Sequence, residues 1–516
     1  MATVLMLVGS ISILLGSWWL YHNMWLFPSR HDHGEGQGCG RIYMLPSSWK
    51  LPFGSDKLLK SLGAEKERRL PLLSLEDHEL YGDTYGQYSG GLFTILTRDS
   101  RNIASLLSEQ FSKFDYGNLR QLCFGCLLGE SIFTENGENW RRSRRLLAPE
   151  LHRPKFPSLA IIESHFQDML RAMTSGTETS PRIGVRPIFY NFTLDTATDL
   201  FLGVSTNLLA LPSSINEEGK RFSSSFDKTL PWLATKERFK MFAWLVTGPE
   251  LWSLCYTARD SLENLIIEAQ RREVGSSFQP FTDFLGKTTD VGKARDELMS
   301  LLFAGRDTNA SLLCWVVYAL AREPTVFEKL EREILSITGT DSNATPNDSD
   351  LMRMHYLEDV IYECLRLFPV VPINGRMCNT TTTLPAGGGK SGEEPILVPK
   401  GTLVCFSTFG CHRSTKYYGE DAMTFRPERW REVDVRTRTQ NYTFHPFIGG
   451  PRKCLGESFA LKLTKYTICR LVQCFRAIEA DDPSSRDGAD WQEDIKYRIG
   501  LTMSPDNDVH VRLTTR

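Results

Sequence analysis

The sequence lacks several features that would assign it to a common class of protein. Its 60 Lys and Arg residues nearly balance 62 Asp and Glu residues, so no excess of one charge indicates a nucleic-acid or purely electrostatic partner. Its 12 cysteines are scattered through apolar context, which favours free thiols in a reducing compartment over a disulfide framework. It contains no internal repeat, no glycine-rich dinucleotide loop and no flavin-binding unit.

One pair of cysteines, Cys123 and Cys126, has the C-x-x-C spacing of metal and redox motifs. A second pair and a nearby histidine are both missing, so a zinc site would have too few ligands. We therefore expect these thiols to be packed in the hydrophobic core.

Charged residues are also missing from the N-terminal stretch Val4–Phe27, whose first part is largely apolar. Roughly 20 such residues suffice to cross a bilayer as a helix, and the tryptophans and tyrosine between 18 and 25 suit the membrane interface. A cleaved signal peptide is the alternative, but the basic start and the small-residue cleavage site are absent. We expect residues 1–30 to be an uncleaved anchor with its flank. The positive charges that follow predict a cytosolic C-terminal side, and a polar, glycine-rich hinge over 31–60 precedes the globular part.

Long helical patterns dominate after residue 60, with short strand-like runs at Leu92–Leu96 and Ile396–Val398. Polar stretches rich in Gly, Pro and Asp interrupt them, and each joins segments too short to fold alone. We expect these stretches to be surface loops of one unit. They are Thr174–Pro181, Thr338–Asp350, Pro385–Pro395 and Asp481–Asp490.

The run Phe447–Gly456 is the most distinctive motif of the chain. Gly449, Gly450 and Gly456 permit backbone angles that a side chain would forbid, and they allow a flat group to approach the main chain closely. The turn that they form presents a single cysteine, Cys454.

Positive charge and a helix start surround this cysteine. Arg452 and Lys453 precede it, and a helical pattern over Glu457–Val472 offers unpaired N–H groups to its sulfur. We expect this environment to favour a thiolate, the axial ligand that haem iron takes in one class of haem proteins.

A second unusual segment interrupts a long apolar helix, predicted from about Lys293 to Arg322 and ended by Pro324. Its buried face is predicted to contain Leu298, Leu301, Leu302, Leu312, Leu313, Val316, Val317 and Leu320.

The interruption is Ala304–Asn309, where small residues are followed by Asp307 and Thr308. Polar groups inside an apolar helix are costly unless they serve a purpose. Gly305 would allow a ligand to approach, and Thr308 can bond back to a carbonyl and open the helix locally. From the residues alone, a functional pair and a polar pair satisfied at a helix kink are equally good interpretations.

The pattern Phe-x-x-Gly-x-Arg-x-Cys-x-Gly resembles the haem-ligand loop of the cytochrome P450 family, and the pair Asp307–Thr308 resembles the oxygen-activation motif of that family. The resemblance covers residues 61–516. It implies a mainly α cytochrome P450 fold, a helix-rich haem domain with a small β-rich part, after the N-terminal transmembrane helix. It also implies haem b with Cys454 as the axial ligand of its iron.

Further residues match this family in the expected order. Trp140 and Arg144 resemble the Trp-x-x-x-Arg that grips a haem propionate, and Arg376 resembles the strand arginine that meets the other one. Arg452 of the ligand loop is expected on the same cofactor. Taken singly, Trp140 could be a core residue beside a basic face and Arg376 a loop cap.

Glu363, Arg366 and Arg429 resemble a buried ionic triad of the family, which we expect to be architectural rather than catalytic. The alternative for Glu363 and Arg366 is a solvated helix pair worth a few tenths of a kcal/mol.

The segment Ala304–Thr308 and three others resemble the alkane and fatty-acid hydroxylases of fungi and the fatty-acid ω-hydroxylases of plants. The other segments are Leu127–Thr134, Phe425–Trp430 and the glycine-rich insertion Pro385–Gly389. These enzymes usually have Thr or Ser where this chain has Asn309, whose amide still donates and accepts hydrogen bonds.

The resemblance implies a monooxygenase of the endoplasmic reticulum membrane, single-pass, with a cytosolic catalytic domain. Asp307 and Thr308 would deliver protons to bound dioxygen. Because the chain has no flavin unit, electrons would come from NADPH-cytochrome P450 reductase, with cytochrome b5 as a further partner. The basic side chains expected to receive the reductase, or otherwise to form a solvated face, are Arg141, Arg142, Arg145, Lys453, Lys462 and Lys465.

Two other functions compete with this one: a haem-thiolate isomerase or dehydratase that needs no reductase, and a non-enzymatic haem carrier or sensor. The retained Asp307–Thr308 pair favours the monooxygenase over both. The anchor and apolar segments such as Leu230–Leu245 predict a lipophilic substrate, either a fatty-acid or alkane-like chain or a polyketide or terpenoid of fungal secondary metabolism.

Overall fold

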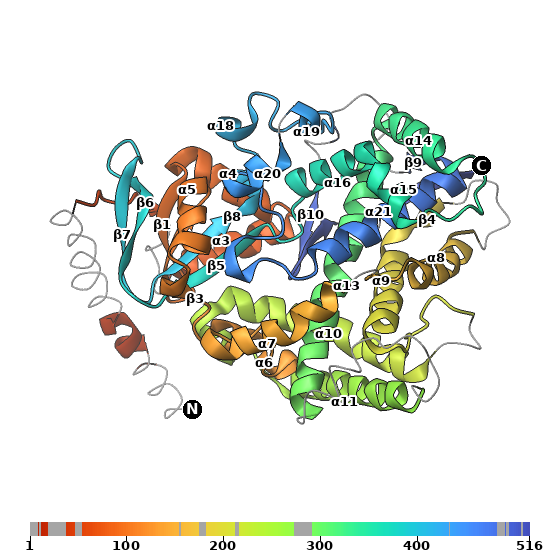
Figure 1. Ribbon diagram of the computed structural model, residues 1–516. Helices are drawn as coiled ribbons and strands as arrows, with labels where there is room; N and C mark the ends of the chain where they lie inside the picture. Colours follow the sequence, from red (N-terminus) through yellow and green to blue (C-terminus); the bar gives the residue numbers. More distant parts are fainter. Residues whose placement is uncertain are drawn as a thin grey trace.

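The computed structural model describes residues 9, 12–18, 38–46, 54–153, 156–174, 182–211, 216–272, 291–432, 434–481, 491, 495–506 and 509–516. Most strands gather at one end of the molecule, helices fill most of the rest, and a small sheet lies at the opposite end near the C-terminus (Figure 1). The mainly α class with a small β-rich part is therefore confirmed.

The helices of the N-terminal half alternate with short strands. They are α3 (Ser55–Lys66), α4 (Leu70–Tyr81), α5 (Ser100–Ala104), α6 (Leu119–Leu128), α7 (Gly137–Leu151), α8 (Leu159–Thr174), α9 (Val185–Leu202), α10 (Glu217–Phe239) and α11 (Pro249–Arg272). Short 3-10 or π turns are η4 (Ser105–Glu109), η5 (Phe111–Lys113), η7 (Lys240–Leu245) and η8 (Gly450–Arg452).

The helices of the C-terminal half include the two longest elements near the site, α13 and α21. They are α13 (Val291–Leu320), α14 (Pro324–Thr338), α15 (Asp348–Arg353), α16 (His355–Leu367), α17 (Thr408–Cys411), α18 (Thr415–Tyr418), α19 (Arg429–Glu432), α20 (Val435–Gln440) and α21 (Glu457–Cys474).

The largest sheet has five strands in the order β1-β2-β8-β5-β3, with β2 and β8 parallel and its other pairs antiparallel. Its strands are β1 (Thr84–Ser89), β2 (Leu92–Thr97), β3 (Phe114–Asp115), β5 (Ile373–Cys378) and β8 (Leu403–Ser407). The smaller sheets contain β4 (Arg182–Gly184), β9 (Phe475–Ala480) and β12 (His510–Thr515); β6 (Thr382–Gly388) and β7 (Glu394–Val398); and β10 (Tyr497–Ile499) and β11 (Met503–Pro505).

Helix α13 runs through the middle of the helical part and packs against α9, α16 and α21 (Figure 1). All eight side chains predicted for its apolar face are buried. The helix ends at Leu320, two residues before the predicted end, and Pro324 begins α14 instead.

One of the predicted surface loops is more ordered than expected. Most of Pro385–Pro395 belongs to the hairpin β6–β7, where Leu384 pairs with Ile396 and Gly388 with Glu394. Proline at 385 did not prevent strand formation because it lies where the pairing is irregular, between Leu384 and Gly388, and strands tolerate proline at such positions. Of the other predicted loops, Thr338–Asp350 is irregular between the end of α14 and the start of α15, and 175–180 and 482–490 lie outside the described residues.

The hinge predicted over 31–60 is wrong in its described part. Ile42 forms a β-bridge with Gly388 and Met44 with Gly86, and Leu45 is buried against Tyr85. Residues 38–46 thus extend the sheet region, and α3 already begins at Ser55. Backbone pairing outweighed the glycine-rich composition.

Most of the predicted anchor, Val4–Phe27, falls outside the described residues, as does 31–37 of the hinge. Among the helices that the structure describes, none is both long and apolar enough to cross a membrane.

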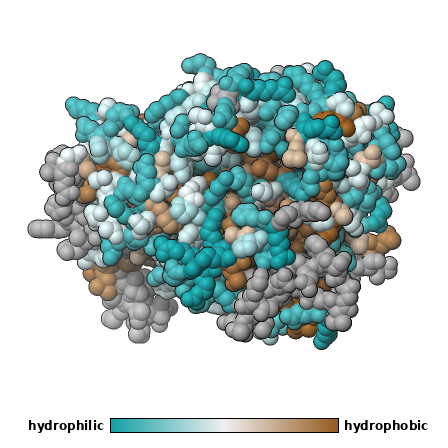
Figure 2. Space-filling view, viewed as in Figure 1, coloured by the Kyte–Doolittle hydropathy of each residue, from teal (hydrophilic) through white to brown (hydrophobic). Residues whose placement is uncertain are grey.

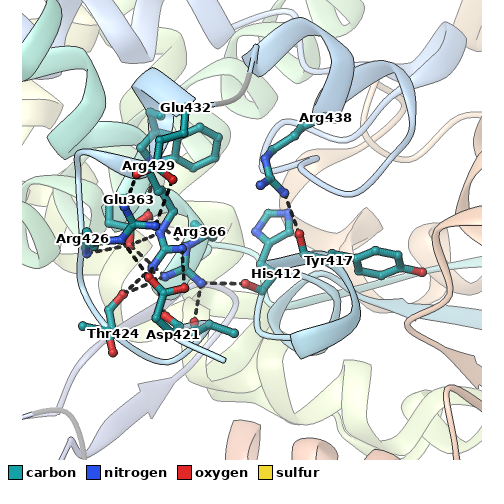
Figure 3. Close-up of polar contacts among 12 residues, drawn as sticks. Glu363, Arg366, His412, Tyr417, Asp421, Thr424, Arg426, Arg429, Glu432 and Arg438 are labelled. Atoms are coloured by element: carbon teal, nitrogen blue, oxygen red, sulfur yellow. Dashed lines mark hydrogen bonds and ion pairs between the residues drawn. The ribbon is translucent and has the colours of Figure 1, made fainter. Parts of the chain in front are cut away.

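The predicted triad is confirmed as a buried cluster (Figure 3). Arg366 donates from Nε and Nη2 to the two carboxylate oxygens of Glu363, at 2.9 and 2.8 Å, and Arg429 donates from Nε at 2.9 Å. Trp430 Nε1 and the Arg426 backbone N–H also donate to this carboxylate. The cluster joins α16 to the segment before the cysteine loop.

Candidate active site

The cysteine loop is closed by its own backbone. Cys454 N–H donates to Phe447 O and Lys453 N–H to Gly450 O, both at 3.0 Å, so η8 is held as a tight turn before α21. This turn fixes where the Cys454 side chain emerges.

The three glycines of this loop have different roles. Gly450 has φ 65°, and a Cβ there would lie 1.8 Å from Leu107 O, so only glycine fits. Gly449 has the extended φ of −149°, but a Cβ would lie 2.4 Å from the Tyr442 ring. Gly456 has φ −87° and an open surrounding, so the expected need for an unusual backbone angle holds only for Gly450.

Cys454 is exposed, whereas the other 11 cysteines are buried or half-buried. Desolvation by the neighbouring protein atoms nevertheless raises the pKa of its thiol. The Gly456 N–H group, Arg144 and Lys453 act to lower that pKa, as expected, but they do not outweigh burial. The groups predicted to favour a thiolate therefore act in the expected direction, while burial acts in the opposite one.

Arg144 lies against the loop. Its Nη1 donates to Lys453 O at 2.9 Å, and its guanidinium is 5.8 Å from the ring of Trp140, one turn earlier on α7. The pair thus shares a helix face as predicted, and Arg144 fixes the backbone beside Cys454.

Three arginines converge on one tyrosine. The guanidinium carbons of Arg120, Arg376 and Arg452 lie 3.5, 4.3 and 4.7 Å from the centre of the Tyr116 ring. Arg452 also lies 4.4 Å from the Trp140 ring. The side chains come from α6, β5, η8 and α7, and they bring three predicted residues together.

This arginine cluster (Arg120, Arg376, Arg452) has no carboxylate partner within ion-pair distance among the described residues. Arg376 is 1% exposed, and its Nη2 is buried without a hydrogen-bond partner. Burial lowers the pKa of all three side chains, that of Arg452 to about 10. Converging cations that are buried or half-buried and have no acid in ion-pair distance are costly, so the cluster is complementary to an anion.

The cluster also changes its tyrosine. Burial alone would raise the pKa of the Tyr116 phenol, but the three arginine charges together outweigh it, and the pKa is lowered. Tyr116 and Arg120 belong to no recognisable motif, so the sequence did not predict them as site residues. Their four-residue spacing across the start of α6 was the only available signal.

Haem b has two propionate carboxylates, and their negative charge is complementary to the cations of this site. The arginine cluster supplies unpaired cations, and Cys454 supplies an accessible sulfur on a fixed loop. Phe459 on α21 and Gly305 on α13 approach each other there, since a Cβ on Gly305 would lie 3.7 Å from the Phe459 ring.

On α13, two consecutive side chains bond back to the helix. Thr308 Oγ1 donates to Ala304 O at 2.5 Å and Asn309 Nδ2 to Gly305 O at 2.6 Å. The bond predicted for Thr308 is confirmed. Ala304 is exposed between buried residues, so this stretch borders accessible space.

A ligand was expected beside Gly305, but two aromatic side chains of the protein lie there instead. A Cβ there would meet the rings of Phe201 and Phe459 at 3.5 and 3.7 Å, which is ordinary contact. The glycine therefore faces protein, and Ala304 and Thr308 are the accessible members of the motif.

Asp307 is buried beside Arg306, with Oδ1 3.4 Å from Arg306 Nη1. Burial raises the pKa of its carboxyl to about 6, although the Arg306 charge lowers it. An acid that titrates near neutral pH can both take up and release protons.

The surface predicted to be basic contains both exposed cations and cations that are paired with acids. Arg141, Arg142 and Arg145 are exposed on α7, over which the surface is hydrophilic (Figure 2). Lys462 and Lys465 are instead half-buried and paired with Asp348 and Glu358. The exposed charge is concentrated on α7.

The fold and this site define a haem-thiolate enzyme, and comparisons with known proteins agree. The cytochrome P450 family model matches residues 66–493. The chain is 36% identical to cytochrome P450 monooxygenase alt2 of Alternaria solani, over 86% of this chain and 87% of that protein. It is 32% identical to cytochrome P450 monooxygenase himC of Aspergillus japonicus, over 98% and 89%.

A third relative comes from a yeast. Cytochrome P450 52A3-A of Candida maltosa is 36% identical over 77% of this chain and 78% of its own length. The chain therefore belongs to the cytochrome P450 family of haem b-dependent monooxygenases, which act on a substrate with O2 and electrons from a redox partner.

Proposed function

We propose that Cys454 is the axial ligand of the haem iron and that the arginine cluster holds the haem carboxylates. Trp140 and Arg144 complete this side of the site from α7. The observation that carries the proposal is the convergence of three guanidinium groups, one buried and two half-buried, without an acid in ion-pair distance, near an exposed cysteine. Bound haem supplies the activation of O2 that places one oxygen atom in a C–H bond.

Asp307 and Thr308 are the proposed proton-delivery residues. The Thr308 hydroxyl is held against Ala304 O and remains half-buried beside accessible Ala304. Asp307 titrates near neutral pH because burial opposes its ionisation. The chain thus places a group that exchanges protons next to a fixed hydroxyl.

The proposed substrate is lipophilic, because aromatic side chains cluster around Phe303, next to the exposed Ala304. Phe303 packs edge-on against Phe133 and Phe124, with ring centres 5.1 and 6.0 Å apart. A fatty-acid or alkane-like chain and a polyketide or terpenoid both suit such aromatic surroundings. Turnover of these candidates by membranes that contain the protein and its reductase distinguishes them.

We propose that the domain 61–516 is tethered to the endoplasmic reticulum membrane by a transmembrane helix in residues 1–30, with the catalytic part in the cytosol. Exposed Met241, Trp244 and Leu245 on η7 support contact with a bilayer. Deletion of residues 1–30 is expected to release the protein from membranes at alkaline pH but not at neutral pH. Release under both conditions contradicts the contact through η7.

The proposed electron donor is NADPH-cytochrome P450 reductase, with cytochrome b5 as a second donor. Arg141, Arg142 and Arg145 on α7 would meet acidic groups of that flavoprotein. Arg144, on the same helix, bonds the loop of Cys454.

The ligand assignment is tested by Cys454→Ser. We expect this variant to lose the characteristic Soret band of the ferrous carbon-monoxide complex together with its activity. Cys474→Ser is the control, because Cys474 is a half-buried thiol at the far end of α21. An unchanged Soret band in Cys454→Ser contradicts the assignment.

A further inference from the structure

Arg306, next to the acid of the proton-delivery pair, is shared between two carboxylates. Its side chain is 2% exposed, and the same Nη1 contacts Asp227 Oδ1 on α10 and, at 3.4 Å, Asp307 Oδ1 on α13. The contact with Asp227 is the closer of the two. One guanidinium nitrogen therefore serves two acids that have different surroundings.

Contacts from α9 and α10 hold the Arg306 guanidinium, which projects from α13, in this position. Its Nε donates to Tyr190 O of α9 at 3.5 Å, and its carbon lies 5.3 Å from the Tyr190 ring and 5.6 Å from the Phe226 ring of α10. These contacts limit how far Arg306 can move towards either acid without a change in its neighbours.

The two acids differ in their access to water. The Asp227 side chain is 49% exposed, whereas that of Asp307 is 12% exposed. Water can therefore solvate the Asp227 carboxylate directly. Asp307 is the acid that would gain most from a closer contact with Arg306, and it has the longer one.

We propose that Asp227 is a positioning residue for proton delivery: it holds the Arg306 guanidinium away from a close ion pair with Asp307 and so keeps the Asp307 carboxyl able to exchange protons. This inference rests on the proposed role of Asp307. A close pair would fix Asp307 as a carboxylate, because an opposite charge within hydrogen-bond distance stabilises the ionised form.

The other charges near Asp307 agree with this division of roles. Among the described residues, Arg186 and Tyr190 face it from α9, Asp227 from α10 and Arg306 from its own helix. Arg186 and Arg306 lower the pKa of Asp307 and Asp227 raises it, while burial has the largest effect. Loss of the Asp227 charge thus removes a negative charge that raises the pKa of Asp307. At the same time it frees Arg306 to move closer to Asp307.

The test is Asp227→Asn in the haem-loaded enzyme. We expect the carboxyl C=O stretch of Asp307, identified by its loss in Asp307→Asn, to titrate lower by about one pH unit in infrared difference spectra. The alkaline limb of the pH profile of kcat is expected to move by the same amount, with a larger solvent isotope effect and an unchanged KM. Asp227→Glu, which keeps the charge, is expected to restore both readouts.

Glu217→Gln is the matched control, because it removes an exposed acid from the first turn of the same helix. A titration of Asp307 that is unchanged in Asp227→Asn, or shifted equally in Glu217→Gln, overturns the inference. A pH profile and isotope effect that do not change in Asp307→Asn instead overturn the proposed role of Asp307, and the inference with it.

Discussion

Two arginine clusters in this protein differ in burial and in the presence of an acid. Arg366 and Arg429 are buried and bond Glu363 and backbone carbonyls, and Arg429 also pairs with Asp421, so both charges are neutralised within the fold (Figure 3). In the arginine cluster around Tyr116, Arg376 is buried, Arg120 and Arg452 are half-buried, and no carboxylate lies within ion-pair distance among the described residues. The first cluster can stabilise the fold alone, whereas the second is completed by an anionic ligand.

The largest expected effect comes from removing the acid of the paired cluster. Glu363→Gln leaves the charges of Arg366 and Arg429 buried, which costs about 3–5 kcal/mol of unfolding free energy. Urea unfolding followed by circular dichroism measures this loss. Glu358→Gln on the same helix is the control: its side chain is 32% exposed and pairs with Lys465, so a loss below about 1 kcal/mol is expected. Equal losses would contradict the architectural role of Glu363.

A smaller effect of opposite sign is expected at Asp307. Its pKa in the folded enzyme, about 6, is above the ordinary value of 3.8, so the folded state binds this proton more tightly than the unfolded state. The associated stability is complete below pH 3.8 and is lost as pH rises through 6. Asp307→Asn removes this loss and should be more stable than the native enzyme by about 3 kcal/mol at pH 7.5.

At pH 4 the difference is expected to fall below about 1 kcal/mol, because Asp307 is then protonated in the folded state and partly protonated in the unfolded state. Thermal unfolding of the holoenzyme at both pH values measures the difference. A variant that is less stable than the native enzyme at pH 7.5 would show that Asp307 is fully paired, like Glu363.

The smallest effect is expected at the surface. Arg142 is exposed on α7, so Arg142→Ala should leave unfolding unchanged and raise the KM for reductase about threefold through lost charge complementarity. The increase is expected to disappear at high salt. Arg436→Ala on α20 is the control; if both variants weaken the reductase equally, α7 is not the specific contact.

Local patterns predicted much of this arrangement. The Cys454 turn, helix α13 and the pair Glu363–Arg366 each lie within a short stretch of sequence, where spacing determines which side chains meet. The bond from Thr308 to Ala304 O follows in the same way from four-residue spacing on a helix.

Features that depend on distant segments were missed. Arg120 and Arg376 meet at Tyr116 although they are far apart in the chain, and no local pattern reports such a contact. The pairing of Ile42 with Gly388 likewise converts part of a predicted hinge into sheet. The burial that raises the pKa of the Cys454 thiol likewise depends on the whole fold.

The comparison between the clusters is tested most directly by the rate of haem transfer from Arg376→Met to an excess of a haem-scavenging protein. Loss of a charge-assisted contact to a haem carboxylate is expected to speed this transfer at least about tenfold. Arg413→Met is the matched control, because Arg413 is equally buried but lies over the ring of Phe409, at 3.6 Å, outside the cluster. Faster transfer in Arg376→Met alone is the predicted result; unchanged transfer, or equal acceleration in both variants, would contradict the assignment of the arginine cluster to the haem carboxylates.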